Sequence, residues 1–182
     1  MSAGYGWSCV PASIEILASE RHGEAQKRKI LQRCRPLRSA GRRVRDELAE
    51  IAHFCEAPRR TRLTTEGEAV ERVFVLASGR VRVERRAEGE RRLHLGQLGA
   101  GDFVGEIAFG QGGVATETAQ VTEVALALTM TTSDLRELAA RNVDVHYALC
   151  AIVFERLSAA ESRVESLLSA GVEALRALAE AR

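Results

Sequence analysis

The hydrophobic period changes twice along this 182-residue chain, and this change constrains its fold most. Over residues 25–56 apolar side chains recur every three or four positions, which predicts two helices. The expected break lies near Pro36, because the residue before a proline avoids the helical conformation, and Pro58 is expected to end the second helix. A stretch with a strand-like pattern follows, and the helical period returns at residue 133.

The middle of the chain predicts several short strands. Arg72–Leu76 is an apolar run that leads into Ser78-Gly79, and Arg80–Glu84 then alternates apolar and charged residues as a half-exposed strand does. Alternation resumes at Arg92–Leu95, and one further strand is expected over Ala119–Met130. Short strands at these intervals favour a small β-roll or barrel, and with the helical regions on both sides the predicted fold class is α+β.

The C-terminal region predicts a long helix whose first cap is Thr132 or Ser133. Gly171 is expected to bend or end this helix and to leave a short helical tail over residues 169–182. Heptad spacing indicates that the helix either packs along its own domain or pairs with a second copy, and we favour pairing. The residues of this predicted dimer seam are Cys150, Val153, Leu157, Ala160, Val164 and Leu167.

A glycine-rich segment over residues 99–121 carries the functional signal. It reads G-A-G-D-F-V-G-E-I-A-F at residues 99–109 and ends T-A-Q-V at residues 118–121. With the preceding V-L-x-S-G-x-V-x-V at residues 75–83, it resembles the cyclic-nucleotide-binding domain family, which includes the catabolite-activator and fumarate–nitrate-reductase regulators. The resemblance spans roughly residues 28–168 and implies an antiparallel β-roll, flanking N-terminal helices and a long C-terminal dimerisation helix.

The resemblance also implies a ligand pocket built by this segment. Backbone N–H groups at the start of a short helix suit an anion, and the Glu106 carboxylate can accept from a ribose hydroxyl. The structural alternative is that Gly105 serves a tight turn and that Glu106 caps the helix start. The implied pocket residues are Gly105, Glu106, Ile107, Ala108, Glu117, Thr118 and Ala119.

One departure from the family pattern concerns the phosphate. In R-x-A-x-V the family has an arginine that pairs with the cyclic phosphate, whereas this chain has Glu117, and no lysine or arginine occurs between Arg92 and Arg136. Losing such a charge-assisted contact costs roughly 1.5–3 kcal/mol. We therefore expect no cofactor and no tight binding of a cyclic nucleotide through the usual contacts, unless an arginine from elsewhere or from a dimer mate replaces the lost cation.

Other chemistries have little support. The four cysteines, which include Cys9 and Cys150, form no C-x-x-C pair, and no metal site or nucleophile–base pair is indicated, so we expect no enzyme. The chain has neither a secretory signal nor an apolar run that would span a membrane, which favours a cytoplasmic protein. Basic residues exceed acidic ones before residue 63, which suits a solvated helix face or a docking surface.

These observations lead to one hypothesis and two alternatives. The hypothesis is a stand-alone regulatory or adaptor protein, a homodimer that binds an unidentified protein partner, with a flexible arm (1–25), a domain (26–168) and a tail (169–182). Too few residues follow Leu168 for a helix-turn-helix, so no direct sequence-specific DNA binding is expected. The alternatives are a sensor of a cyclic nucleotide or another small molecule, and a transcription-regulator relative that pairs with a DNA-binding partner.

Overall fold

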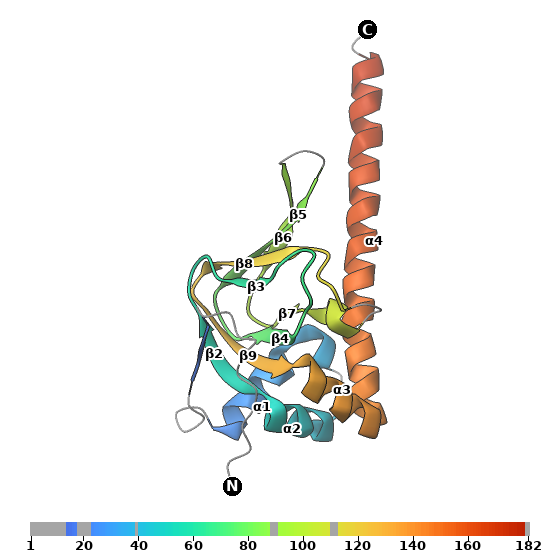
Figure 1. Cartoon of the computed structure of the whole chain (residues 1–182). Coiled ribbons are helices and arrows are strands. Elements are labelled where there is room, and N and C mark those ends of the chain that lie inside the picture. Colours follow the sequence, from blue (N-terminus) through green and yellow to red (C-terminus); the bar gives the residue numbers. More distant parts are fainter. Residues whose placement is uncertain (1–13, 18–22, 39, 88–90, 110–112, 181–182) are drawn as a thin grey trace.

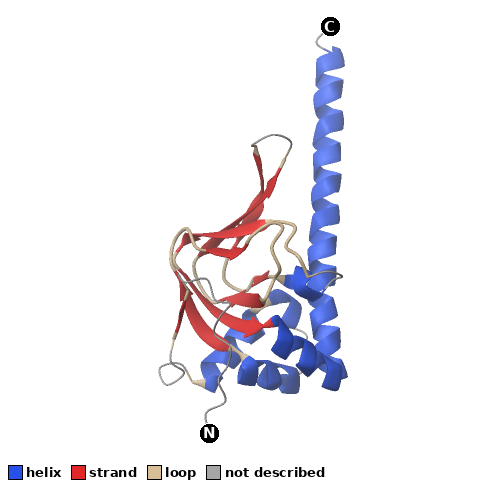
Figure 2. Cartoon of the chain, viewed as in Figure 1, coloured by secondary structure: helices blue, strands red, loops and turns tan. Residues whose placement is uncertain are grey.

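The protein consists of a β-roll, a group of helices beneath it, and one long helix beside it that extends past the roll (Figures 1 and 2). The computed structural model describes residues 14–17, 23–38, 40–87, 91–109 and 113–180. The expected α+β class and antiparallel roll are confirmed. In the described residues, no helix has the length and apolar character that a membrane crossing requires.

The described strands form two antiparallel sheets. The first has the order β1 (Glu15–Ile16), β2 (His53–Ala57), β9 (Ala125–Thr131), β4 (Arg72–Leu76) and β7 (Phe103–Val104). The second has the order β3 (Arg62–Thr64), β8 (Thr118–Glu123), β5 (Arg80–Arg86) and β6 (Arg92–Leu98). The strand expected over residues 119–130 is thus two strands in different sheets, and Val124 between them is 51% exposed.

Strand β4 shows how alternation builds two cores. Its side chains are buried on both faces: Val73 and Val75 join the core between the first sheet and the helices, and Phe74 and Leu76 join the core inside the roll. Neighbouring β9 divides in the same way between the two cores. The helices therefore cover the outer face of the first sheet, and its inner face closes the base of the roll.

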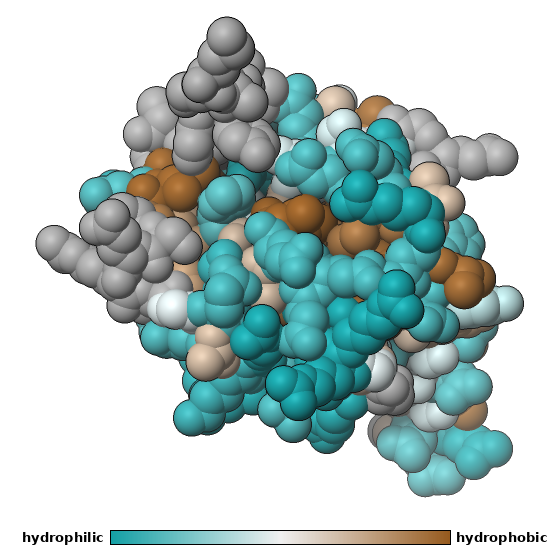
Figure 3. Space-filling model, turned by 90° about the horizontal axis from the view of Figure 1, so that it is seen from below, coloured by the Kyte–Doolittle hydropathy of each residue, from teal (hydrophilic) through white to brown (hydrophobic). Residues whose placement is uncertain are grey.

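The N-terminal helices confirm the break at Pro36. Helix α1 (Glu24–Arg33) is followed by the 3₁₀ turn η2 (Arg35–Leu37) and then by α2 (Arg42–Ile51). The expected end of the second helix at Pro58 is wrong, because residues 53–57 pair with β9 as strand β2. Seen from the end where the N-terminal helices lie, most of the surface is hydrophilic (Figure 3).

The segment expected to be an N-terminal arm is described only in part. Within it, β1 pairs with β2, and Ile14 is buried in the core inside the roll. The rest of the expected arm before residue 14 lies outside the described residues. The boundary at residue 25 stays a prediction.

Two helices end the described chain, α3 (Thr132–Arg141) and α4 (Val143–Glu180). The cap of α3 is Thr131, one residue before the expected position, because its side chain accepts a hydrogen bond from the backbone N–H of Asp134 at 3.0 Å. The expectation that Gly171 bends or ends the helix is also wrong, since α4 continues through it. One glycine costs about 1 kcal/mol relative to alanine, which α4 tolerates without breaking.

Candidate ligand pocket

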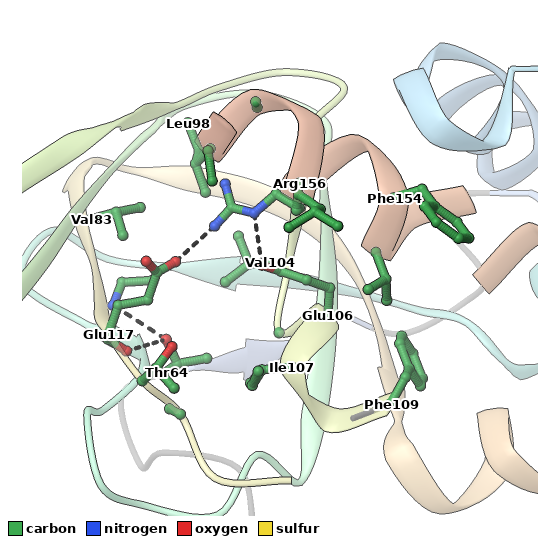
Figure 4. A pocket seen from close by; sticks show the side chains of 18 of the residues that line it. Thr64, Val83, Leu98, Val104, Glu106, Ile107, Phe109, Glu117, Phe154 and Arg156 are labelled. Atoms are coloured by element: carbon green, nitrogen blue, oxygen red, sulfur yellow. Dashed lines mark hydrogen bonds and ion pairs between the residues drawn. The ribbon is translucent and has the colours of Figure 1, made fainter. Parts of the chain in front are cut away.

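A cavity of about 1160 Å³ lies between the roll and α4 (Figure 4). One wall is the inner face of the roll, where Val83, Leu98 and Val104 supply apolar side chains. The other wall is one side of α4, from Leu149 to Leu167. A large apolar lining with a few polar groups at defined positions is typical of a site that binds a small organic molecule.

Glycine at residue 105 lets the backbone turn into the cavity. Its φ of +97° belongs to the left-handed region, and a Cβ atom there would lie 3.0 Å from the backbone oxygen of Arg72. The 3₁₀ turn η3 (Glu106–Phe109) follows at once and directs the Glu106 side chain toward α4. Within this turn the N–H of Ala108 donates to the backbone oxygen of Gly105 at 3.0 Å, so that this N–H is already used.

Glu117 lies immediately before β8 and points into the same cavity (Figure 4). The Thr64 hydroxyl links its backbone to β3, because it donates to the Glu117 backbone oxygen at 3.3 Å and accepts from the N–H of Ala119 at 3.2 Å. The position at which the family pattern has a phosphate-binding arginine therefore carries a carboxylate within the pocket.

Arg156 of α4 is the cation that joins the two carboxylates. Its Nε donates to Oε1 of Glu106 at 2.7 Å, and its Nη2 donates to Oε1 of Glu117 at 2.7 Å. The side chains are 31% (Arg156), 16% (Glu106) and 27% (Glu117) exposed. We call these three residues the Arg156 triad. Sequence reasoning left open an arginine from elsewhere in the chain, but no local motif marks this one, which lies 39 residues after Glu117.

Burial and charge act against each other in the Arg156 triad. Burial raises the pKa of Glu117 most; the nearby Arg156 charge lowers it, Glu106 raises it, and the net result is a pKa above the ordinary value. For Arg156, burial lowers the pKa, but the charges of Glu106 and Glu117 outweigh it and raise the pKa above its usual range. The guanidinium thus stays charged between two carboxylates that compete for it.

Most of the predicted pocket residues line the cavity, and two do not. Ala108 is fully buried in the core beneath the roll, and the hydroxyl of Thr118 accepts from the backbone N–H of Glu66 at 3.1 Å. The residues that do line it are Gly105, Glu106, Ile107, Glu117 and Ala119. All six predicted seam residues of α4, from Cys150 to Leu167, also line it.

Helix α4 carries large apolar side chains that the single chain leaves exposed. Exposed fractions run from 50 to 68% at Tyr147, Phe154, Leu157, Val164, Leu168 and Val172. Five of these lie seven, three, seven and four residues apart, which places them on one side of the helix. We call these five residues the α4 stripe; they are Tyr147, Phe154, Leu157, Val164 and Leu168.

Metal and thiol chemistry have no visible site in the described part of the chain. No group of three or more His, Cys, Asp or Glu side chains there is placed to hold a metal ion. Burial raises the pKa of the Cys34 and Cys55 thiols to about 12, which keeps both protonated at neutral pH. Cys150 is a free, half-buried thiol on α4, and Cys9 lies outside the described residues.

Comparisons with known proteins identify the fold. A family model described as a cyclic nucleotide-binding domain matches residues 54–142. A cyclic nucleotide-binding domain from Methylobacillus flagellatus is 16% identical, with a TM-score of 0.68 over 83% of this chain and 85% of that one. No curated protein sequence matches the chain.

Two longer proteins share the same fold. The catabolite activator protein of Thermus thermophilus is 23% identical, with a TM-score of 0.63 over 72% of this chain and 62% of that one. The regulatory subunit of a cAMP-independent protein kinase A from Trypanosoma brucei, a triple mutant bound to cAMP, is 17% identical, with a TM-score of 0.55 over 68% of this chain and 51% of that one. This chain spans less than two thirds of each.

Proposed function

Because residues 54–142 belong to the cyclic nucleotide-binding domain family, we propose that this protein is a non-enzymatic regulatory or adaptor protein that acts as a dimer through protein contacts. The observation that carries the proposal is the Arg156 triad. Glu117 stands where the family pattern has the phosphate-binding arginine, and its partner is a cation of the chain itself. The position where a cyclic phosphate would need a cation is therefore occupied by a carboxylate, which already pairs with Arg156.

The charges of the triad disfavour a cyclic phosphate. A bound phosphate would meet two carboxylates, Glu106 and Glu117, and would have to take Arg156 from both. Removing one partner from a buried ion pair leaves an uncompensated charge, which typically costs about 3–5 kcal/mol when burial is complete. The side chains here are partly buried, so the cost is smaller, but it has the same sign for both carboxylates.

The α4 stripe supports the dimer. Contiguous apolar residues on a soluble helix mark a protein contact, and spacing of three and four residues is that of a two-stranded coiled coil. A second copy of α4 offers an identical stripe, as a two-fold axis requires. Ligand-independent pairing of α4 would then present the roll and the N-terminal helices to a partner protein.

Titration of cyclic AMP and cyclic GMP into the parent protein and a Glu117→Arg variant tests the pocket. We expect no binding by the parent up to millimolar nucleotide. The variant restores the family's cation at this position and is expected to bind, because Arg156 then keeps Glu106 as its partner. Binding by the parent with a Kd below about 10 μM, roughly −7 kcal/mol, would contradict the proposal.

Sedimentation equilibrium tests the dimer. We expect a dimeric mass at micromolar concentration, and a monomeric mass for Phe154→Asp, because a carboxylate in an apolar helix contact is costly. Ser162→Asp, an exposed position on another side of α4, is the matched control and should remain dimeric. A parent that is monomeric at micromolar concentration would refute the dimer and, with it, this form of the proposal.

A second candidate function is a small-molecule sensor. The observation in its favour is that an arginine from outside residues 93–135 does enter the pocket, on a helix whose stripe residues Phe154, Leu157 and Val164 line the same cavity. A ligand that changes the partners of Arg156 would change how α4 is held. Binding of any small molecule with a matching change in α4 would favour this function over a purely structural role for the cavity.

A further inference from the structure

We propose that the cavity binds an organic cation, a guanidinium or ammonium group on an apolar body, which takes the place of the Arg156 side chain between Glu106 and Glu117. This inference rests on the second proposed function, ligand sensing, and specifies its ligand. In this structure the Arg156 side chain of α4 occupies the position between the two carboxylates that the ligand cation would take.

The charge of the lining carries the first step. Its ionisable residues on the roll are Arg85, Glu106 and Glu117, and Arg85 is exposed at the rim. The inner ionisable groups of the roll are therefore the two carboxylates alone. Charged groups removed from water need a partner of opposite sign, so that the roll by itself is a receptor for a cation.

The helices supply the remaining charges of the lining, and among these residues Arg156 is the one that contacts the two carboxylates. The lining also includes Arg136 of α3 and His146 and Arg163 of α4, which are exposed residues. Arg136 donates to the backbone oxygen of Ala108 at 2.6 Å, and Arg163 donates to the backbone oxygen of Leu95. Neither shares a salt bridge with Glu106 or Glu117, although the charge of Arg163 also lowers the pKa of Glu117, so Arg156 is the cation in direct contact with the two carboxylates.

The geometry at Arg156 fits a guest with two or more N–H donors. Two different nitrogens of the guanidinium donate to two carboxylates, one from η3 and one from the residue immediately before β8. A free guanidinium has the same flat array of donors, and an ammonium has three. Beside the carboxylates, apolar side chains such as Val83, Leu98 and Val104 would contact the apolar body of the ligand.

Exchange would also release α4. Arg156 is one of the two arginines that bind α4 to the roll; the other, Arg163, has a single backbone partner on β6. Once a ligand cation holds Glu106 and Glu117, Arg156 has no carboxylate to pair with and is repelled by the guest. The upper part of α4, with the α4 stripe, would then be free to move relative to the roll.

Three probes with the same eight-carbon chain test the ligand class by calorimetric titration: octylguanidinium, octanol and octanoate. We expect octylguanidinium to bind at least tenfold more tightly than octanol, and octanoate to bind least. Arg156→Ala removes the competing internal cation and should tighten octylguanidinium binding at least tenfold. Arg136→Ala, which removes a lining arginine that donates to the backbone oxygen of Ala108, is the matched control and should leave the affinity within threefold.

Glu117→Gln and Glu106→Gln keep side-chain size and should each weaken octylguanidinium binding at least tenfold, which separates the carboxylates from detergent-like binding to the apolar stripe. If octanoate binds as tightly as octylguanidinium, the inference that the ligand is a cation is overturned, and the sensor function stays in place. Failure of all three probes would overturn the inference, whereas the sensor function is decided by binding of any other small molecule and the dimer by sedimentation. If Arg156→Ala binds octylguanidinium with the affinity of the parent, the ligand does not displace the Arg156 side chain, and the inference is overturned.

Discussion

Replacing Arg156 with alanine should destabilise the protein by about 2 kcal/mol. An exposed ion pair is worth about 0–1 kcal/mol, and breaking a fully buried one costs about 3–5 kcal/mol. Arg156, Glu106 and Glu117 lie between these limits, since their side chains are 31, 16 and 27% exposed. The variant loses two charged hydrogen bonds and leaves two carboxylates to repel each other in one cavity.

Urea denaturation measures this change in the free energy of unfolding, and heating gives an independent reading. For a chain of this size, 2 kcal/mol corresponds to a fall of roughly 4–8 °C in Tm. Arg156→Ala combined with Glu117→Gln should be more stable than Arg156→Ala alone, because the second change removes one of the unpaired charges. An Arg156→Ala variant within 0.5 kcal/mol of the parent, or a double variant that is no more stable than the single one, would refute the reasoning.

Three further predictions concern the pocket and the long helix. The pKa of Glu117 is raised in the folded state, so the folded protein binds this proton more tightly than the unfolded chain does. The stability of the parent relative to Glu117→Gln should therefore fall as pH rises above the ordinary carboxyl range. Urea midpoints between pH 4.5 and 7.5 measure this fall. Gly105→Ala should cost about 1–3 kcal/mol, because it combines a positive φ with a 3.0 Å contact, whereas Gly171→Ala, in open space within α4, should increase helix content by circular dichroism. Leu168→Asp should give a monomer in sedimentation, as is expected for Phe154→Asp. A dimeric Leu168→Asp variant would show that the dimer contact does not include this end of the α4 stripe.

Strong periodicity made parts of the fold predictable. The apolar run of β4 and the strict alternation of β5 lie where the sequence predicts strands. The break at Pro36 follows from proline stereochemistry. These features are local, because the residues that carry the pattern are the same residues that form the strand or the break.

Short or interrupted elements escaped prediction. Strands β1, β3 and β7 have two or three residues each, too few to show a period, and they form because a neighbouring strand is there to pair with. Residues 53–57 continue the apolar spacing of α2, yet pairing with β9 makes them a strand. Gly171 read alone predicts a helix end, but a single unfavourable residue does not outweigh the helix on both sides of it.

The sequence predicted the part of the candidate site that belongs to the roll, but not the part that belongs to α4. The glycine-rich segment predicts a ligand pocket, and the structure places its Gly105, Glu106 and Glu117 on one cavity. The partner of these carboxylates was not predictable, because Arg156 belongs to an ordinary helical pattern and meets Glu106 only after α4 has folded back along the roll. Charge in the pocket is thus a property of the tertiary structure and not of the motif.

The pairing of Arg156 with Glu117 is the central claim, and the ionisation of Glu117 reports on it most directly. A carbon-detected NMR titration of the Glu117 carboxyl group in the parent and in Arg156→Ala measures it. We expect a pKa above the ordinary glutamate value in the parent, because burial dominates, and a still higher pKa in the variant, because the cation that lowers it is gone. Equal pKa values in the two proteins would show that Arg156 does not pair with Glu117, and would contradict the account.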